Sequence, residues 1–203
     1  MKHFISLILI TLFIASCSSS KNFSKEEEKL IMSANSLKPM RVFKITSKQD
    51  SLLLRTKSTY IKADPNNAVL QSFVKRLYAT VRDSLSMGVG IAAPQVGVLK
   101  NIIWVQRFDK ENLPFEVYLN PKITKYSEKK QVCREGCLSI PNRRDTLSSR
   151  SFSISIEYDT MKSEHIKETV EGFTSVIFQH EIDHLNGILY LDHLAKEIKN
   201  AKN

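Results

Sequence analysis

The sequence has little cysteine, glycine or proline, with three Cys, six Gly and six Pro among 203 residues. These counts exclude a disulfide-dense mini-protein and a collagen-like chain. The longest apolar run, from Phe4 to Ile14, is far shorter than the about 20 residues that a transmembrane helix needs. Hydrophobic residues (42%) and charged residues (25%) are near globular averages, so the composition predicts one folded domain with a tail or two.

Sequence signals for nucleic acid or nucleotide binding are also missing. Lys and Arg exceed Asp and Glu by 30 to 21, which gives a formal net charge of +9. A basic excess is compatible with nucleic acid or an anionic membrane, but no aromatic-basic motif, phosphate loop or G-x-G-x-x-G accompanies it. We therefore interpret the excess as a solvated basic surface and expect no nucleic-acid partner.

The first residues are typical of an export signal. A positive start is followed by the apolar run and then by Ile14-Ala15-Ser16-Cys17. This ending resembles the lipobox of bacterial lipoproteins, which implies cleavage before Cys17 and lipidation of that residue. We expect a lipoprotein of the bacterial cell envelope, held to a membrane by Cys17 and facing the periplasm or the exterior. The alternative is a cleavable secretory signal with an incidental Cys.

The chain then divides into four parts. We predict a signal peptide at 1–16, the lipidated Cys and a flexible tether at 17–38, a catalytic domain at 39–195 and a basic tail at 196–203. Within the domain, Asp64-Pro65 is typical of a helix start, and apolar residues at helical spacing follow as far as about Gly88. Three strands and a later helix are predicted at 102–105, 115–119, 151–158 and 173–184. This order favours an α+β fold with an antiparallel or mixed sheet.

The segment Gln179-His180-Glu181-Ile182-Asp183-His184 is the strongest chemical signal. Two His four residues apart share one helix face, and Glu181 lies where a carboxylate would reach a metal-bound water. Cys137 is a candidate third ligand, which would leave one tetrahedral position open, as catalytic sites require. Two alternatives remain: a closed site that includes Cys133, and a surface helix with scattered His and acids.

Two further segments complete a family pattern. Gly88-Val89-Gly90-Ile91-Ala92-Ala93-Pro94-Gln95 precedes Glu135-Gly136-Cys137-Leu138-Ser139, and the histidine segment follows both. Together, in this order, they resemble the peptide deformylases over about residues 41–194. The resemblance implies mixed or antiparallel sheets around a central metal-binding helix. It also implies removal of the N-formyl group from formyl-methionyl peptides, with release of formate.

The resemblance implies a role for each matching residue. Cys137, His180 and His184 would hold one divalent ion, expected to be Fe²⁺, with Zn²⁺, Ni²⁺ and Co²⁺ as alternatives. Glu181 would move the proton, while Gln95 and the N–H of Leu138 would face the oxyanion. Val89 and Gly90 would pair with the peptide backbone. The pocket for the Met side chain would be lined by Cys133, Phe173, Val176 and Ile177. We expect a monomer that binds formyl-Met peptides or protein N-termini.

Two other functions use the same residues. A metalloprotease would need a third ligand after the helix, where only His193 is available, at a spacing of nine rather than the six of metzincins. A non-catalytic lipoprotein could retain the deformylase fold as a binding module. The polar stretch 142–150 after Pro141 is predicted to be an exposed loop beside the site.

Overall fold

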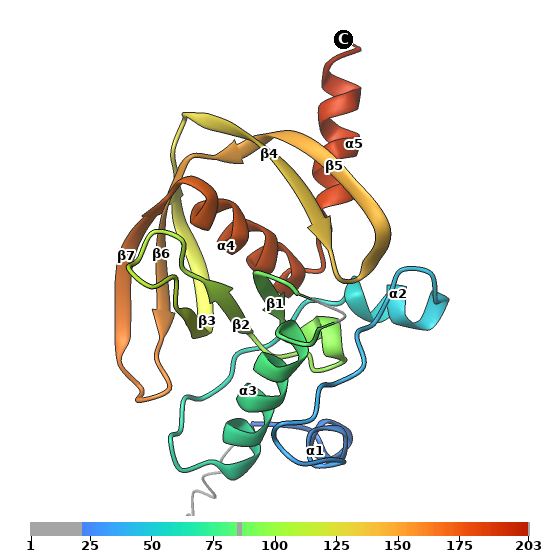
Figure 1. The fold of residues 1–203 in the computed structure, drawn as a ribbon, viewed down its shortest axis with the longest axis vertical. Coiled ribbons are helices and arrows are strands. Elements are labelled where there is room, and N and C mark those ends of the chain that lie inside the picture. Colours follow the sequence, from blue (N-terminus) through green and yellow to red (C-terminus); the bar gives the residue numbers. More distant parts are fainter. Residues whose placement is uncertain (1–21, 85–86, 203) are drawn as a thin grey trace, which may run out of the picture.

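The computed structural model describes residues 22–84 and 87–202. The predicted signal peptide and Cys17 lie outside these residues. Within the described part of the chain, no helix is long and apolar enough to cross a bilayer. The fold is α+β, as predicted, and its two sheets are both antiparallel (Figure 1).

Five strands form the larger sheet, in the order β1-β2-β3-β6-β7, and β4 and β5 form a separate two-stranded sheet. The strands are β1 (Gly90–Ala92), β2 (Ile102–Gln106), β3 (Phe115–Tyr126), β4 (Lys130–Cys137), β5 (Ile140–Ser151), β6 (Ser153–Asp159) and β7 (His165–Glu171).

The predicted strands of the larger sheet are confirmed. In β6, Ile154 and Ile156 are buried while Ser153 and Ser155 are less so, which is the alternation of a strand with one face on the core. In β2, Ile102 and Ile103 are both buried because apolar residues cover both faces of this strand. Strand β3 continues to Tyr126, beyond the predicted end at 119.

The β4–β5 hairpin corrects one prediction. The stretch 142–150 was expected to be a loop, but it lies within β5 and pairs with β4, for example Arg144 with Gly136 and Arg150 with Gln131. Leu147 is its one buried apolar residue, so the alternating apolar pattern of a strand is absent there. The hairpin arches over α4 (Figure 1).

Helix α4 (Gly172–Leu185) lies between the hairpin and the larger sheet (Figure 1). Phe178, Ile182 and Leu185 pack against a buried cluster of sheet residues that includes Ile103 and Tyr118. The predicted helix is therefore confirmed, and it is central to the fold. Gly187, with φ +72°, follows the helix end, as its predicted role in terminating the helix requires.

The other helices surround this centre: α1 (Lys25–Ile31), α2 (Lys48–Leu54), α3 (Ala68–Val81), the 3₁₀ turn η1 (Ala93–Val96) and α5 (Tyr190–Asn200). Helix α3 begins later than predicted because the side chain of Asn67, rather than Asp64, caps it by accepting from the N–H of Leu70. It ends at Val81 and not near Gly88.

The prediction of a flexible tether over 17–38 is wrong for the part that the structure describes. Ser24 and Glu27 form a capping box that starts α1. Phe23 and Ile31 are buried in the core beside α3. Arg76 of α3, itself buried, donates to the carbonyls of Leu30, Ile31 and Lys38. Residues 22–38 are therefore docked on the domain.

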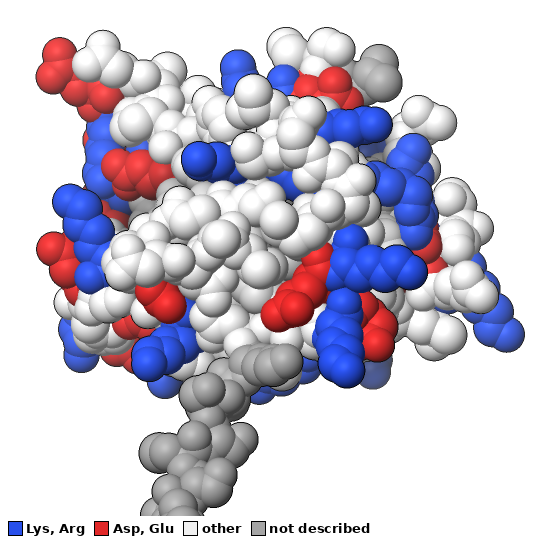
Figure 2. Space-filling view, turned by 90° about the horizontal axis from the view of Figure 1, so that it is seen from below, with Lys and Arg blue, Asp and Glu red and all other residues white. Residues whose placement is uncertain are grey.

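The predicted basic tail at 196–203 is also partly ordered. Helix α5 continues to Asn200, and the carboxylate of Glu197 accepts hydrogen bonds from the backbone N–H groups of Ser148 and Ser149 on β5. The face that Figure 2 shows mixes acidic and basic side chains among mostly uncharged atoms, so the positive excess is not concentrated on that face.

Candidate functional site

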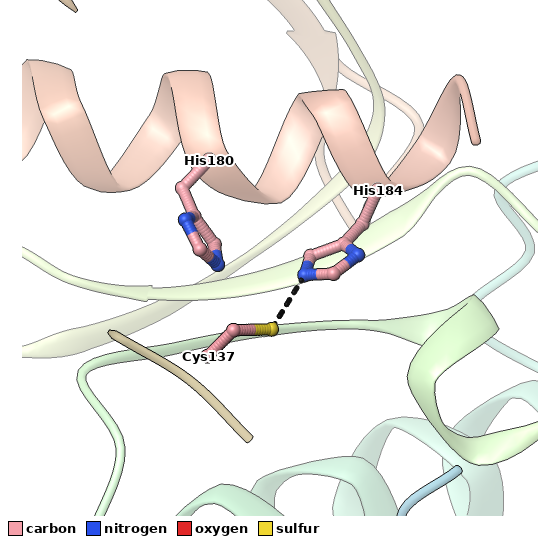
Figure 3. A group of neighbouring side chains, drawn as sticks. All are labelled: Cys137, His180 and His184. Atoms are coloured by element: carbon pink, nitrogen blue, oxygen red, sulfur yellow. Dashed lines mark hydrogen bonds between the residues drawn. The ribbon is translucent and has the colours of Figure 1, made fainter. Parts of the chain in front are cut away.

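Cys137, at the end of β4, meets His180 and His184 of α4 (Figure 3). One ligand atom from each of the three lies within 4.8 Å of the other two, and Cys137 Sγ is 3.1 Å from His184 Nε2. The two imidazoles are one helical turn apart, so both face the sulfur. A thiolate and two imidazoles form a donor set that fits a divalent transition-metal ion.

A carboxylate orients the first histidine. His180 Nδ1 donates to Glu135 Oε2 at 2.8 Å, which leaves Nε2 available to a metal. Glu135 also accepts two hydrogen bonds from Arg150, at 2.7 and 3.0 Å. Burial would raise the pKa of Glu135, but the hydrogen bonds from His180 and Arg150 outweigh burial and lower this pKa to about 2. Glu135 is therefore ionised at neutral pH.

This pairing extends to α4 and α5. Arg150 Nη1 donates to Asp183 Oδ2 at 2.6 Å, and the same oxygen lies 2.8 Å from His193 Nε2. Asp183 and His193 thus support the site without being ligands. Gln179 fixes the start of the same helical turn, because its side chain exchanges hydrogen bonds with the backbone N–H and C=O of Ser151.

The sulfur is held in its ligand form. Burial disfavours the Cys137 thiolate, but the two neighbouring imidazoles outweigh burial and hold the pKa of this thiol well below its usual range. Cys133 differs, because burial raises the pKa of its thiol. Only the thiolate binds a metal, so the electrostatics favour Cys137 over Cys133 as the ligand.

Glu181 is a buried acid that follows His180 directly on α4. Its side chain is buried, and its Oε2 has no hydrogen-bond partner among the described residues. Burial raises the pKa of Glu181 to about 7, in the range that suits a general base at neutral pH. Gly90 makes room for it, since a Cβ at that position would lie 2.5 Å from Glu181 Oε1 and 2.8 Å from Ile177 Cγ2.

Gln95 and Leu138 complete the polar part of the site. Gln95 Oε1 accepts from the N–H of Ala92 at 2.9 Å, which turns its Nε2 toward Ser139 Oγ (3.2 Å) and Cys137 Sγ (3.5 Å). The amide N–H group is therefore aimed at the metal site. Leu138 lies in the tight turn between Cys137 and the start of β5.

A cleft of about 810 Å³ opens onto these residues. Of the predicted substrate-binding residues, five line it: Val89, Gly90, Phe173, Val176 and Ile177. Cys133 does not, because it lies on β4 opposite Leu147, four residues before Cys137. The assignment of Cys133 to the pocket therefore stays a prediction.

The structure favours one of the open alternatives for the ligand set. Among the described residues, the clustered ligand atoms belong to Cys137, His180 and His184 and do not include Cys133 or His193. A closed site with Cys133 and a third ligand at His193 are thus not supported. Arg150 is the residue that sequence reasoning missed most clearly, because it belongs to the stretch interpreted as an exposed loop.

Fold and site together define a metal-dependent hydrolase, with three protein ligands, a buried carboxylate beside them and an open cleft. The family model described as "Polypeptide deformylase" matches residues 42–200. The chain belongs to the polypeptide deformylase family. The resemblance noted from the three motifs is thereby confirmed.

Individual relatives agree. The peptide deformylase of Desulforudis audaxviator is 37% identical over 161 residues, which cover 75% of this chain and 94% of that protein. A class I type b peptide deformylase of Acinetobacter baumannii, solved with Met-ala-ser bound, superposes with a TM-score of 0.67 at 31% identity, covering 76% of this chain and 98% of that one. The Thermotoga maritima peptide deformylase superposes with a TM-score of 0.65 at 30% identity, covering 76% and 97% of the two chains.

Proposed function

We propose that the protein hydrolyses the N-formyl group of formyl-methionyl peptides and releases formate. The observation that carries this proposal is the Cys137–His180–His184 cluster with the unpartnered Glu181 oxygen beside it. Family membership supports the reaction class. The Acinetobacter relative with Met-ala-ser bound supports a methionyl peptide as the ligand of the cleft.

Each residue then has a defined task. Cys137, His180 and His184 would hold one divalent ion, which lowers the pKa of water and polarises the formyl carbonyl when bound. Glu181 takes the proton of the attacking water and transfers it to the leaving amine. The amide of Gln95 and the N–H of Leu138 donate to the oxyanion, and losing one such donor typically costs about 10²–10³ in rate.

The peptide would bind at an open sheet edge. Strand β1 is at the edge of the larger sheet, because β2 is its one neighbour in the strand order. An extended peptide would pair with Val89 and Gly90 there. The methionine side chain would then enter the part of the cleft lined by Val176, Ile177 and Phe173, which suits an unbranched apolar side chain.

We further propose Fe²⁺ as the native ion, with Zn²⁺, Ni²⁺ and Co²⁺ as alternatives, because thiolate and imidazole ligands accept all four.

Lipidation of Cys17 is supported by the sequence Ile14-Ala15-Ser16-Cys17. The side chain of Asn22 hydrogen-bonds the backbone of Lys62 in the domain. The five peptide units from Cys17 to Asn22 can span at most about 17 Å, so a lipid on Cys17 would hold the domain within that distance of the membrane. Labelling cells with a fatty-acid probe tests this, and an unlabelled protein would refute the anchor.

Formate release tests the activity. Protein that begins at Ser18, loaded with Fe²⁺ without oxygen, should hydrolyse a formyl-Met peptide. Glu181→Ala should retain the metal, and its rate of formate release should fall about 10²–10⁴-fold. The matched control is Glu171→Ala, an exposed acid just before α4, which should retain turnover. Turnover by Glu181→Ala at the wild-type rate would contradict the assignment, and metal binding without turnover in the wild type would favour a binding module.

A further inference from the structure

The outer rim of the cleft is basic. Four exposed cations line it, namely Lys44, Arg134, Arg143 and Arg144. The acids that line the cleft are Glu135 and Glu181, and both are buried in its floor. The charge at the mouth is therefore positive. Arg143 and Arg144 belong to the stretch 142–150, which was interpreted from sequence as an ordinary exposed loop.

Most of this charge is not neutralised. Arg143 is paired with Asp145 at 2.7 Å. Among the described residues, no carboxylate lies within 4.0 Å of the charged groups of Lys44, Arg134 or Arg144, whereas the nearby Glu135 is paired with Arg150. Three cations thus face the cleft without a protein counter-charge.

The position of Arg144 is set by the hairpin. It pairs across the strands with Gly136, the neighbour of the ligand Cys137. A Cβ on Gly136 would lie 3.0 Å from Arg144 Cγ and 3.3 Å from its Nε, so the arginine side chain lies across this glycine. A larger residue at 136 would displace the guanidinium from the rim.

Lys44 comes to the same place from another part of the chain. The next residue, Ile45, donates its backbone N–H to the carbonyl of Ser139 at 3.0 Å. Ser139 belongs to the tight turn that follows Cys137. Lys44 and the cations of the hairpin therefore approach one mouth from two segments that are held together.

We propose that this basic rim selects formyl-methionyl peptides that carry a carboxylate in the residues just after methionine. The inference rests on the proposed function. A peptide extended from Val89 and Gly90 advances about 3.3 Å per residue, so its second and third residues leave the floor of the cleft and pass the rim. The carboxylate could be an Asp or Glu side chain, or the C-terminal carboxylate of a short peptide.

Four peptides test the preference: formyl-Met-Ala-Ala amide, formyl-Met-Glu-Ala amide, formyl-Met-Lys-Ala amide and formyl-Met-Ala-Ala with a free carboxylate. At low salt, the two carboxylate peptides should exceed the neutral amide about three- to tenfold in kcat/KM, mainly through KM. The Lys peptide should fall below the amide. The differences should shrink at about 0.5 M salt, because the rim is exposed.

Variants locate the effect. Arg134→Gln and Arg144→Gln should each bring the ratio of carboxylate to neutral peptide closer to one, and the double variant should bring it closest. Lys162→Gln is the matched control, because it removes an exposed cation in the turn between β6 and β7 and should leave the ratio unchanged.

The outcomes separate this inference from the proposed function. A gain for the Glu peptide supports recognition of side chains, and a gain for the free carboxylate supports recognition of short peptides. Equal hydrolysis of all four peptides would overturn the basic-rim proposal and leave deformylation intact. A ratio that is unchanged in the double variant would overturn it as well. Hydrolysis of none of the peptides would instead contradict the proposed function.

Discussion

Arg107 and Arg150 are both almost fully buried, at 2% and 3% exposure, and both are bonded to acids, yet they support different parts of the molecule. Arg150 donates to Glu135, which in turn accepts from His180, a proposed metal ligand. Arg107 follows β2 and donates to Glu168 on β7, so it joins strands of the sheet. Burial and ion pairing therefore do not identify a site residue by themselves. A site residue is identified instead by the group that its paired acid contacts.

Both arginines are charged inside the protein. Burial would lower their pKa values, but hydrogen bonds to the surrounding carboxylates outweigh burial and raise both. Removing Arg150 would leave Glu135 buried without this counter-charge, which typically costs about 3–5 kcal/mol, whereas the side chains of Asp109 and Glu168 around Arg107 are 28% and 22% exposed and partly solvated. The comparison then predicts a larger loss of stability without Arg150 than without Arg107, and an effect on metal binding without Arg150 alone.

The largest effect is expected for Arg150→Met, which keeps most of the volume and removes the charge. Glu135 and Asp183 would both lose a partner, so the free energy of unfolding should fall by about 3–5 kcal/mol. His180 would also be oriented less firmly, which should weaken metal affinity about 10–100-fold. Urea unfolding of metal-free protein measures the first, and competition with a chelator measures the second. Unchanged competition would show that Glu135 orients His180 without Arg150.

Arg107→Met should lower stability without the effect on the metal. It leaves Asp109 and Glu168 without their cation, but both are partly solvated, so we expect a loss of about 1–3 kcal/mol in the free energy of unfolding. The chelator competition of the folded variant should match the wild type. If the metal affinity fell as it does in Arg150→Met, the distinction between the two arginines would be lost.

Acid should narrow the difference between wild type and Arg107→Met. The hydrogen bond from Arg107 is the main cause of the lowered pKa of Asp109. An acid with a lowered native pKa contributes stability that is fully present above its unfolded pKa, about 3.9 for Asp, and is lost as pH falls through the native value. Unfolding free energies of metal-free wild type and variant between pH 7 and pH 3 measure this. A constant difference across that range would contradict the charge pairing.

The two arginines also show what a sequence can reveal. His180 and His184 could be predicted as ligands because the four-residue spacing needs only a helix to bring them together. Arg150 could not be predicted as part of the site, because its strand was not recognised. Between residues 142 and 150, β5 carries a single buried apolar residue, Leu147. A strand without apolar alternation is indistinguishable from a loop in one sequence. Arg107 follows a correctly predicted strand, and Asp109 is two residues away, but its other acidic partners, Glu116 and Glu168, come from β3 and β7.

The N-terminal segment was missed for a different reason. Its polar composition favoured a tether, although Ser24 and Glu27 stand at the spacing of a capping box. A short helix is marginal alone, so its order depends on packing, here of Phe23 and Ile31 and on the carbonyl contacts of Arg76. Such contacts between distant segments are not visible in local patterns.

The smallest effect is expected for a substitution of Cys133, which can be compared with Cys137 on the same strand. Cys133, Glu135 and Cys137 are two residues apart along β4, so their side chains lie on the same face of the strand. Yet its sulfur is outside the ligand cluster, and burial raises the pKa of its thiol. Cys133→Ala should therefore keep one metal ion per chain and near-wild-type stability, whereas Cys137→Ala should lose the metal. Metal-to-protein ratios of the two variants decide this, and loss of the ion from Cys133→Ala would mean that the thiol four residues away completes the metal site after all.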